Sequence, residues 1–430
     1  MRFKLFFILI ILNFLFSQSL LNRALGNNET FGSSRSYAMG FTHSLNANNS
    51  SLVQYNPSLI LYTASNKKLV FDLQTNLSMI KERRSILVKD YFGDFLTYAD
   101  YVSNSNHYNY FQGGFIVNVN NTIGLAFSLL PIASFDYDYL EEIRGSADIE
   151  DGDVGMKDPL VGYQIFNTSG QLNSLSLGSS YSHKNYNIGI GYHKILKTEI
   201  TDDMHVDSLT TQIENLSEIQ DYYHEESFDD LGGYYSVGIS FITNEFLLSI
   251  NFEEEILIKT DQYQGFNFDS SMGVISYLDE ANQNFVLSGL NYYKPCKLNV
   301  GISYNPKNNS DLTISAEYEN NKISDSDEYY YLKNHNIYKL GFEYILSNST
   351  PVRAGLIYKQ SPILLMPDQS IITCGTGGNF KNIFYDVGLS YRLFDYYYPD
   401  LFPLNNDSNT SFDKITESKL NIVFSMRYLF

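Results

Sequence analysis

The sequence of 430 residues predicts an all-β fold, a transmembrane antiparallel β-barrel of about fourteen strands behind a short N-terminal plug. Three observations predict this fold. Apolar and polar side chains alternate with a period of two, short and long connections alternate along the chain, and aromatic residues are abundant while charged residues are few. We expect residues 1–19 to form a signal peptide, residues 20–67 a plug or hatch segment and residues 68–430 the barrel.

The N-terminus has the layout of an export signal. Arg2 and Lys4 precede an apolar run from Leu5 to Phe16, and the small or polar residues 17–19 follow as a cleavage region. The run is shorter than the roughly 20 residues of a spanning helix, so an anchor helix is the less favoured alternative. No later segment is apolar enough for such a helix. The mature chain is therefore soluble, or it crosses a membrane as strands.

Composition favours a membrane barrel and excludes other classes. The chain has 36 Tyr, 30 Phe and no Trp, and 18% of its residues are charged, against roughly 25% in soluble proteins. Aromatic girdles at both membrane interfaces would use these residues. Cys296 and Cys374 cannot build a disulfide framework. The net charge of −19 argues against a nucleic-acid partner, and we expect no cofactor.

The predicted strands follow from side-chain alternation. In the segment 68–80, Leu69, Phe71 and Leu73 lie on one face, and Asp72 and Gln74 lie on the other. Most of the segments have about the 9–11 residues that a tilted membrane strand needs. The other predicted strands lie near 108–119, 122–131, 174–183, 186–194, 234–243, 246–256, 297–304, 311–319, 336–345, 352–359, 370–378, 382–393 and 419–430.

Connections between these strands fall into two length classes. The short ones all contain Asn, which tolerates the left-handed backbone of tight turns; they are 120–121, 184–185, 244–245, 305–310, 346–351 and 379–381. The long ones are 81–107, 132–173, 195–233, 257–296, 320–335, 360–369 and 394–418. Strict alternation of the two is typical of outer-membrane barrels and not of a soluble β-sandwich or propeller, the competing interpretation. Phe285–Tyr293 also looks strand-like, but a fifteenth strand would break the alternation, so we assign it to a long loop.

The long loops carry much of the negative charge, notably in 136–158 and 199–230. A solvated loop surface is the simple interpretation. The alternative is divalent-cation binding, for which the nearest cluster lacks full EF-hand spacing; it consists of Asp148, Glu150, Asp151 and Asp153.

The segment 35–62 contains two motifs that precede the first strand. One is an Arg-Ser-x-x-Met-Gly run and the other a Tyr-Asn-Pro run in which Ser58 follows; the matching residues are Arg35, Ser36, Met39, Gly40, Tyr55, Asn56 and Pro57. They resemble the plug of the FadL superfamily, which includes long-chain fatty-acid transporters, aromatic-hydrocarbon transporters and PorV-type proteins. The segments 295–318 and 351–358 also resemble elements of that family, and the terminal Phe430 resembles the signal read by the barrel-insertion machinery.

Local chemistry gives the second motif a role of its own. Pro57 fixes its own φ angle and biases Asn56 toward an extended backbone. We therefore predict a rigid turn in the barrel mouth, with an ordinary loop turn as the alternative.

The alternation also predicts which charged residues point into the barrel: Asp72, Glu317, Lys339, Glu343, Arg353, Asp386, Arg392 and Arg427. Charges of mixed sign inside a barrel most often form a structural ion-pair network. The sharper hypothesis is that one of four cations receives an anionic head group such as a carboxylate, for which Arg suits bidentate recognition; the four are Lys339, Arg353, Arg392 and Arg427.

The resemblance implies an outer-membrane protein for passive uptake of hydrophobic or amphipathic small molecules such as long-chain fatty acids. Ligand would enter from the outer face, pass the plug and leave through a lateral opening. Outer-membrane lipids, the ligand and the insertion machinery are the implied partners. A PorV-like role, with subunits of a protein secretion system as partners, is the alternative. An enzyme is the weakest hypothesis, because none of the seven His stands in an HExxH or Ser-His-Asp arrangement.

Overall fold

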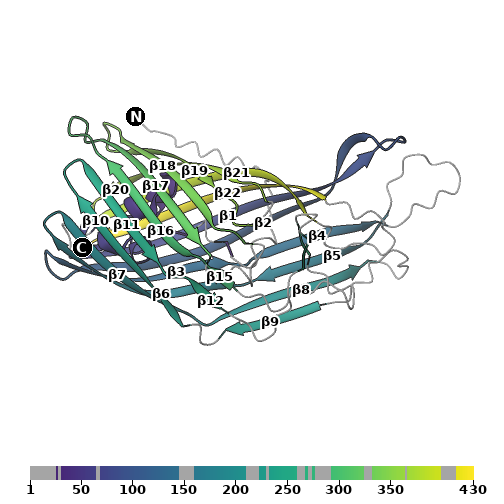
Figure 1. Cartoon of the computed structure of the whole chain (residues 1–430), viewed down its shortest axis with the longest axis horizontal. Helices are drawn as coiled ribbons and strands as arrows, with labels where there is room; N and C mark the ends of the chain where they lie inside the picture. Colours follow the sequence, from purple (N-terminus) through teal and green to yellow (C-terminus); the bar gives the residue numbers. More distant parts are fainter. Residues whose placement is uncertain are drawn as a thin grey trace.

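The chain folds into a closed antiparallel barrel that holds a cluster of short helices (Figure 1). The computed structural model describes residues 26–27, 31–63, 68–144, 159–209, 222–228, 232–258, 267–269, 274–276, 292–323, 332–363, 366–398 and 413–430. The expected signal peptide and the acidic cluster around residue 150 lie outside the described residues.

Fourteen strands make up the barrel, and β1 pairs with β22 to close it, as at Asp72 opposite Arg427. The predicted strand number and order are confirmed. The strands are β1 (Leu69–Lys89), β2 (Phe95–Asn118), β3 (Ile123–Ser134), β6 (Gln171–His183), β7 (Tyr186–Ile195), β10 (Gly233–Ile242), β11 (Phe246–Glu253), β16 (Cys296–Tyr304), β17 (Leu312–Lys322), β18 (His335–Ile345), β19 (Pro351–Lys359), β20 (Gln369–Phe380), β21 (Ile383–Tyr398) and β22 (Asp413–Leu429).

The outer face of the barrel is apolar over a band between two sets of aromatic residues. On β18, Leu340 and Phe342 point outward, while Lys339 and Glu343 are buried inside. Outward aromatic residues toward the long loops include Tyr192, Tyr235, Tyr318, Tyr338 and Tyr358; those toward the short turns include Tyr181, Tyr186, Phe246, Tyr344, Phe380 and Tyr385. An exposed apolar band of this kind is one that a lipid bilayer covers.

Several segments that the sequence predicted as long loops form strands in the structure. The connection 81–107 is mostly strand, because β1 and β2 continue as paired strands into a projecting hairpin (Figure 1). The loops before and after β6–β7 contribute a separate four-stranded sheet of β4 (Tyr137–Arg144), β5 (Leu160–Ser169), β8 (Thr198–Ser208) and β9 (Tyr222–Phe228). These segments form strands because each one pairs with a neighbouring strand. The sequence of a single segment does not show which other segment it will pair with.

Two small strand pairs lie in the loop after β11. β12 (Ile256–Ile258) pairs with β15 (Tyr292–Lys294), and β13 (Asn267–Asp269) pairs with β14 (Val274–Ser276). Tyr292 and Tyr293, the last residues of the fifteenth strand-like segment, belong to β15 outside the barrel, and 285–291 lie outside the described residues. Within the described residues, short and long connections between the barrel strands therefore alternate as predicted.

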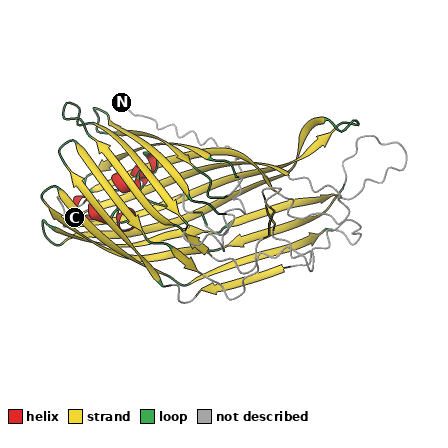
Figure 2. Cartoon of the chain, in the orientation of Figure 1, coloured by secondary structure: helices red, strands yellow, loops and turns green. Residues whose placement is uncertain are grey.

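The plug consists of α1 (Ser34–Ala38), α2 (His43–Asn46), α3 (Leu52–Tyr55), η2 (Pro57–Leu59) and α4 (Ile60–Thr63). Its helices, red in Figure 2, lie inside the barrel toward the short-turn end. In the described part of the chain, no helix is both long and apolar enough to cross a membrane. Upstream, Asn27 pairs with Ser134 of β3, so the chain comes down from the long-loop side before it forms the plug.

The long-loop end of the lumen is covered by a compact apolar cluster, which we call the cap. It joins residues of β3, β6, β7, β8, β10, β12 and β15 with Phe135, which follows β3: Ile132, Ala133, Phe135, Leu172, Ile195, Ile200, Tyr234, Ile256, Ile258 and Tyr292. Tyr137 and Tyr139 of β4 also anchor the extra sheet to the barrel, since Tyr137 donates a hydrogen bond to Glu82 and Arg84 lies over the ring of Tyr139.

Candidate functional site

The barrel wall around the plug is shaped by glycines. A Cβ added to Gly355 would lie 2.1 Å from the backbone nitrogen of Gly40, and one added to Gly189 would lie 2.2 Å from the carbonyl carbon of Pro57. Only glycine permits such an approach of wall to plug. Other wall glycines at which an added Cβ would lie 3.0 Å or less from a plug atom are Gly114, Gly124, Gly178, Gly191, Gly238, Gly301, Gly341, Gly375 and Gly388. Sequence reasoning missed this belt, although its members fall on the inward-facing positions of the predicted strands.

The first plug motif fixes the start of the plug to the wall. Arg35 binds Glu343 of β18 through both Nε and Nη2, at 3.1 and 2.6 Å. Gly40 has a φ of +67° and donates its N–H to Thr373 Oγ1 at 2.9 Å. Met39 is fully buried beside Gly341.

Within the plug, Ser36 of α1 contacts the first residue of α2. Ser36 Oγ donates to the carbonyl of Ser33 and lies 2.7 Å from Nδ1 of His43. Burial, reinforced by the charge of Lys339, holds the pKa of His43 well below 6.5. The ring of His43 is therefore a neutral hydrogen-bonding element of the plug.

The second motif forms the compact turn that its chemistry predicts. Asn56 has an extended backbone with φ −164°, and Pro57 is the first residue of η2. The Asn56 side chain accepts hydrogen bonds from the N–H and the hydroxyl of Ser58 and donates to the carbonyl of Ser44 at 2.6 Å. Ser58 adds a contact of 2.6 Å to Ser240 Oγ on β10. One side chain thus joins two plug helices near the wall.

All eight charged residues that alternation placed in the lumen face inward, and the four candidate head-group cations are all engaged. Lys339 binds Glu317 and Glu319 at 2.8 and 2.6 Å. Arg392 binds Glu417 at 2.9 Å and Gln369 at 2.9 Å. These contacts make Lys339 and Arg392 members of internal ion pairs.

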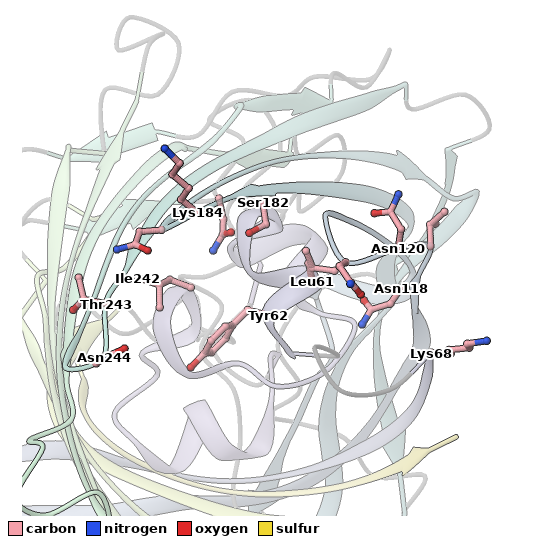
Figure 3. A pocket seen from close by; sticks show the side chains of 14 residues that line it. Leu61, Tyr62, Lys68, Asn118, Asn120, Ser182, Lys184, Ile242, Thr243 and Asn244 are labelled. Carbon is pink, nitrogen blue, oxygen red and sulfur yellow. The ribbon is translucent and has the colours of Figure 1, made fainter.

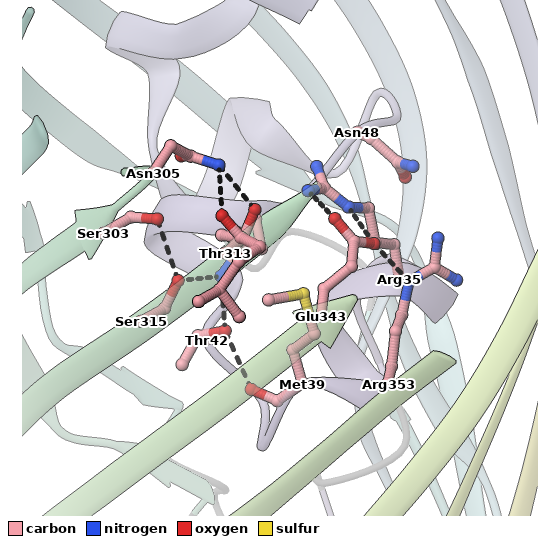
Figure 4. A network of polar contacts seen from close by, with 12 residues as sticks. Arg35, Met39, Thr42, Asn48, Ser303, Asn305, Thr313, Ser315, Glu343 and Arg353 are labelled. Carbon is pink, nitrogen blue, oxygen red and sulfur yellow. Dashed lines mark hydrogen bonds and ion pairs between the residues drawn. The ribbon is translucent and has the colours of Figure 1, made fainter. Parts of the chain in front are cut away.

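Arg353 and Arg427 belong to a network that starts at the plug, and Figure 4 shows its first members, Arg35, Glu343 and Arg353. Arg353 lies between two carboxylates, Glu343 at 2.6 Å and Asp386 at 2.7 Å. Arg427 Nη2 stands 3.5 Å from Asp386, and its Nη1 donates to the carbonyl of Asn48 at 3.0 Å. The network joins Arg35 of α1 to β18, β19, β21 and β22.

Three cavities formed by residues of the described chain lie beside the plug. The cap-side cavity, of about 70 Å³, lies between plug and cap and is lined by residues including Phe31, Phe41, His43, Ile357 and Ile371. On the short-turn side, the arginine cavity has about 500 Å³ and is lined by residues including Arg35, Arg353 and Arg427. The asparagine cavity, of about 1060 Å³, is lined by Asn118, Asn120, Lys184 and Asn244 among others (Figure 3). Tyr62 lines both short-turn cavities.

The remaining candidates have simple structural places. His193 is fully buried between Ser176 and Ser236, with its ring nitrogens 2.7 and 2.9 Å from their hydroxyl oxygens. Among the described residues, no group of three His, Cys, Asp or Glu side chains is arranged to hold a metal ion. Phe430 is exposed and pairs through its N–H with the carbonyl of Leu69.

Comparison with known proteins shows a shared fold at low identity. No protein-family model matches the chain, and no curated relative is found by sequence. The fold matches a FadL homologue of Pseudomonas aeruginosa with a TM-score of 0.61 at 14% identity, over 94% of this chain and 100% of that one. It also matches the toluene transporter TodX of P. putida (TM-score 0.57, 12% identity, 94% and 99% covered) and the toluene transporter TbuX of Ralstonia pickettii (TM-score 0.53, 14% identity, 94% and 99% covered). The predicted resemblance is confirmed for the fold.

Proposed function

We propose that this chain, which has the fold of FadL-type channels, lies in a bacterial outer membrane and passes hydrophobic or amphipathic small molecules inward without an energy source. One observation carries the proposal. The lumen of a closed barrel holds a plug, and two apolar clusters line parts of the lumen beyond and beside that plug. Such a lumen selects for apolar solutes, as ligand sites lined by apolar and aromatic side chains do.

Apolar side chains lie on both sides of the cavity between the cap and the plug. Ile132 and Tyr292 belong to the cap and also line the cap-side cavity. Phe41, Ile357 and Ile371 also line it and belong to a second apolar cluster beside the plug. A solute that passes between these side chains exchanges water for hydrocarbon and aromatic contacts, which is worth about 25 cal/mol per Å² of apolar surface buried.

Uptake into liposomes tests this function. The mature protein is reconstituted, and uptake of a labelled long-chain fatty acid and of a neutral aromatic hydrocarbon is followed. We expect saturable uptake of at least one, and a several-fold loss in Ile371→Gln, which places an amide in the cap-side cavity. Thr243→Gln, which lines the asparagine cavity at the barrel rim, is the matched control and keeps full uptake. Uptake no faster than in empty liposomes rejects the function.

A specific surface favours the second candidate, a PorV-like role as a binding component of a protein secretion system. The hairpin of β1 and β2 projects far beyond the barrel (Figure 1) and presents Tyr91 and Phe92 at its tip, 97% and 85% exposed. Asp90 accepts hydrogen bonds from the N–H groups of Phe92 and Asp94 and so holds the turn in one shape. Rigid exposed aromatic residues are the usual anchors of protein interfaces.

Co-purification separates the two roles. The full chain is isolated from its own cells under mild detergent, and secretion-system subunits or cargo recovered with it are identified by mass spectrometry. The PorV-like role requires that these proteins be recovered and that Tyr91→Ser with Phe92→Ser releases them. Recovery of the barrel alone, together with saturable uptake, leaves the channel role.

A further inference from the structure

We propose that one side of the barrel fits a bilayer thinner than a usual outer membrane and therefore binds lipids with short acyl chains. This side consists of β7, β10, β11, β16, β17, β18 and β19, and we call it the low wall. In the strand order it lies opposite the seam, where β1 and β22 pair to close the barrel. The inference goes beyond the channel function and rests only on the membrane location of the barrel.

Aromatic residues mark both edges of the apolar surface on the low wall. On β18, Tyr338 and Tyr344 stand at the two edges, and Leu340 and Phe342 are exposed between them. Aromatic rings on the outer face of a barrel occupy the two membrane interfaces, so the hydrocarbon of the bilayer has to fit between them. Three further strands carry outward aromatic residues at the same spacing of six positions: Tyr186 and Tyr192 on β7, Tyr235 and Phe241 on β10, and Phe246 and Phe252 on β11.

Polar groups begin directly beyond the edge of the low wall on the long-loop side. Tyr318, Tyr338 and Tyr358 stand in a row, with ring centroids 5.5 and 6.3 Å apart. The hydroxyl of Tyr318 donates to Asn336 Oδ1 at 2.8 Å, and that of Tyr358 donates to the exposed carboxylate of Asp368. Burying an amide or a carboxylate in hydrocarbon is costly, so the hydrocarbon ends below these hydroxyls. Two positions beyond the last outward apolar residue, each strand of the low wall has a residue without a large apolar side chain: Lys194, Gly233, Glu254, Cys296, Asn320, Asn336 and Gln360.

The apolar surface is longer at the seam. On β21 the outward residues are apolar or aromatic throughout 383–393, and Leu393 is 57% exposed. Along β22 to the C-terminus they are apolar or aromatic throughout 420–430. The first charged outward residue of β21 is Asp395, whose carboxylate binds Lys414 at 2.9 Å. These two runs are therefore four residues longer than those between the aromatic edges of the low wall.

Strand geometry converts these lengths into heights. A strand rises about 3.3 Å per residue, and barrel strands tilt by about 35–45° from the barrel axis. Six residue steps on the low wall then give a height of about 15 Å, and ten steps at the seam give about 25 Å. Outer-membrane barrels usually carry an apolar band about 25 Å tall. The seam therefore fits a bilayer of usual thickness, whereas the low wall is too short for one by about 10 Å.

The bilayer has to adjust to this difference on one side of the barrel. Tilting the whole barrel moves one side up and the other down, but it changes the height of neither apolar surface. Thinning of the bilayer beside the low wall keeps Asn336 and Asp368 in water, and lipids with short acyl chains reduce the cost of that thinning. Such lipids should therefore gather beside the low wall and not beside the seam.

The chain contains no Trp, so single Trp reporters can test the inference without background fluorescence. Phe342→Trp on β18 and Phe424→Trp on β22 place one reporter on each side, at positions that are 42% and 43% exposed. The full mature protein is reconstituted in phosphatidylcholine with chains of eighteen carbons. Brominated phosphatidylcholine with chains of fourteen or of eighteen carbons is then added, and the quenching of each reporter gives the relative binding of the two lipids beside it.

Variants that raise the edge of the low wall provide the second comparison. Asn320→Leu combined with Asn336→Leu extends the apolar surface on two paired strands, and Gln360→Leu extends it on β19. Each is made with the Phe342→Trp reporter and, as the matched control, with the Phe424→Trp reporter.

We expect the shorter lipid to bind about threefold more strongly beside the Phe342→Trp reporter and no more strongly than the longer one beside Phe424→Trp. The edge variants should abolish the preference at the first reporter and leave the second unchanged. The same relative binding at both reporters, or a preference that no edge variant lowers, overturns the inference. A Phe342→Trp reporter that no lipid quenches also overturns it, because a protein would then cover the low wall. If neither reporter is quenched, the barrel does not lie in the bilayer, and its membrane location is refuted as well.

Discussion

Replacing Gly355 by Ala tests whether the plug is held by close contact with the wall. The added Cβ would lie 2.1 Å from the nitrogen and 2.5 Å from the Cα of Gly40. Both atoms are backbone, so no flexible side chain can yield. The plug must therefore retreat by more than 1 Å to reach ordinary van der Waals distance, about 3.4 Å or more.

The cost follows from what that retreat breaks. Overpacking of a tight contact costs about 1–3 kcal/mol. The hydrogen bond from Gly40 N–H to Thr373 Oγ1, 2.9 Å long, is stretched as well and contributes about 1 kcal/mol. The sum of about 2–4 kcal/mol favours the displaced plug by a factor of about 30 to 1,000, since 1.4 kcal/mol is tenfold in an equilibrium constant. The barrel ladder, which is closed by strand pairing alone, loses nothing.

Hydrogen exchange measured by mass spectrometry tests whether the plug is displaced, because the exchange rate of plug amides reports the local opening equilibrium. We expect peptides from the plug to lose protection by that factor, while peptides from β18 and β19 remain protected. Ala354→Val enlarges the adjacent residue on the outer face of the same strand and should leave the plug unchanged. Unaltered plug protection in a folded Gly355→Ala barrel would refute the view that contact with the wall glycines holds the plug.

Three further outcomes are expected. Arg35→Gln removes a two-point ion pair with Glu343 and should lower plug protection by about tenfold, with Arg83→Gln, on an exposed pair, as the inert control. Asn56→Ala removes the side chain that bonds Ser44 and Ser58 and should lower the urea midpoint by the equivalent of about 1–3 kcal/mol; an unchanged midpoint contradicts its assigned role. The pKa of His43 in the folded protein lies well below its value of 6.5 in the unfolded chain. Below pH 6.5 the unfolded chain therefore binds a proton at this residue that the folded protein does not. The free energy of unfolding is at its full value above pH 6.5 and declines below it by up to about 1.4 kcal/mol per pH unit. The pH slope of unfolding should therefore flatten in His43→Gln, and equal slopes would count against the buried neutral ring.

Local patterns in the sequence were sufficient for the barrel and for most side-chain orientations. Leu340 and Glu343 point to opposite faces as their alternating positions require. The short connections that contain Asn stand at one end of the barrel, and the strand count follows from them. Asn56 and Pro57 form their turn through bonds between near neighbours in the chain.

Longer-range features were not predictable from the same patterns. Two features depend on which strands pair with each other, and this is visible only in the folded chain. They are the extensions of β1 and β2 and the sheet of β4, β5, β8 and β9. The glycine belt was visible as glycines at inward positions, but only the folded plug gives those positions their neighbours. Likewise, the two interpretations of the lumen cations, ion pairs or a head-group site, separate only when distances are known.

Taken by itself, the amino-acid sequence determined the alternation of faces, the number of membrane-length strands and the turn at Asn56–Pro57, because each of these arises from residues a few positions apart. The tertiary structure decided that Lys339 and Arg392 form ion pairs within the barrel wall, whereas Arg353 and Arg427 share Asp386 in a network that reaches the plug. That difference depends on strand register and on the position of the plug in the barrel. Both bring together residues hundreds of positions apart, such as Asn48 and Arg427, whose contact no local pattern encodes.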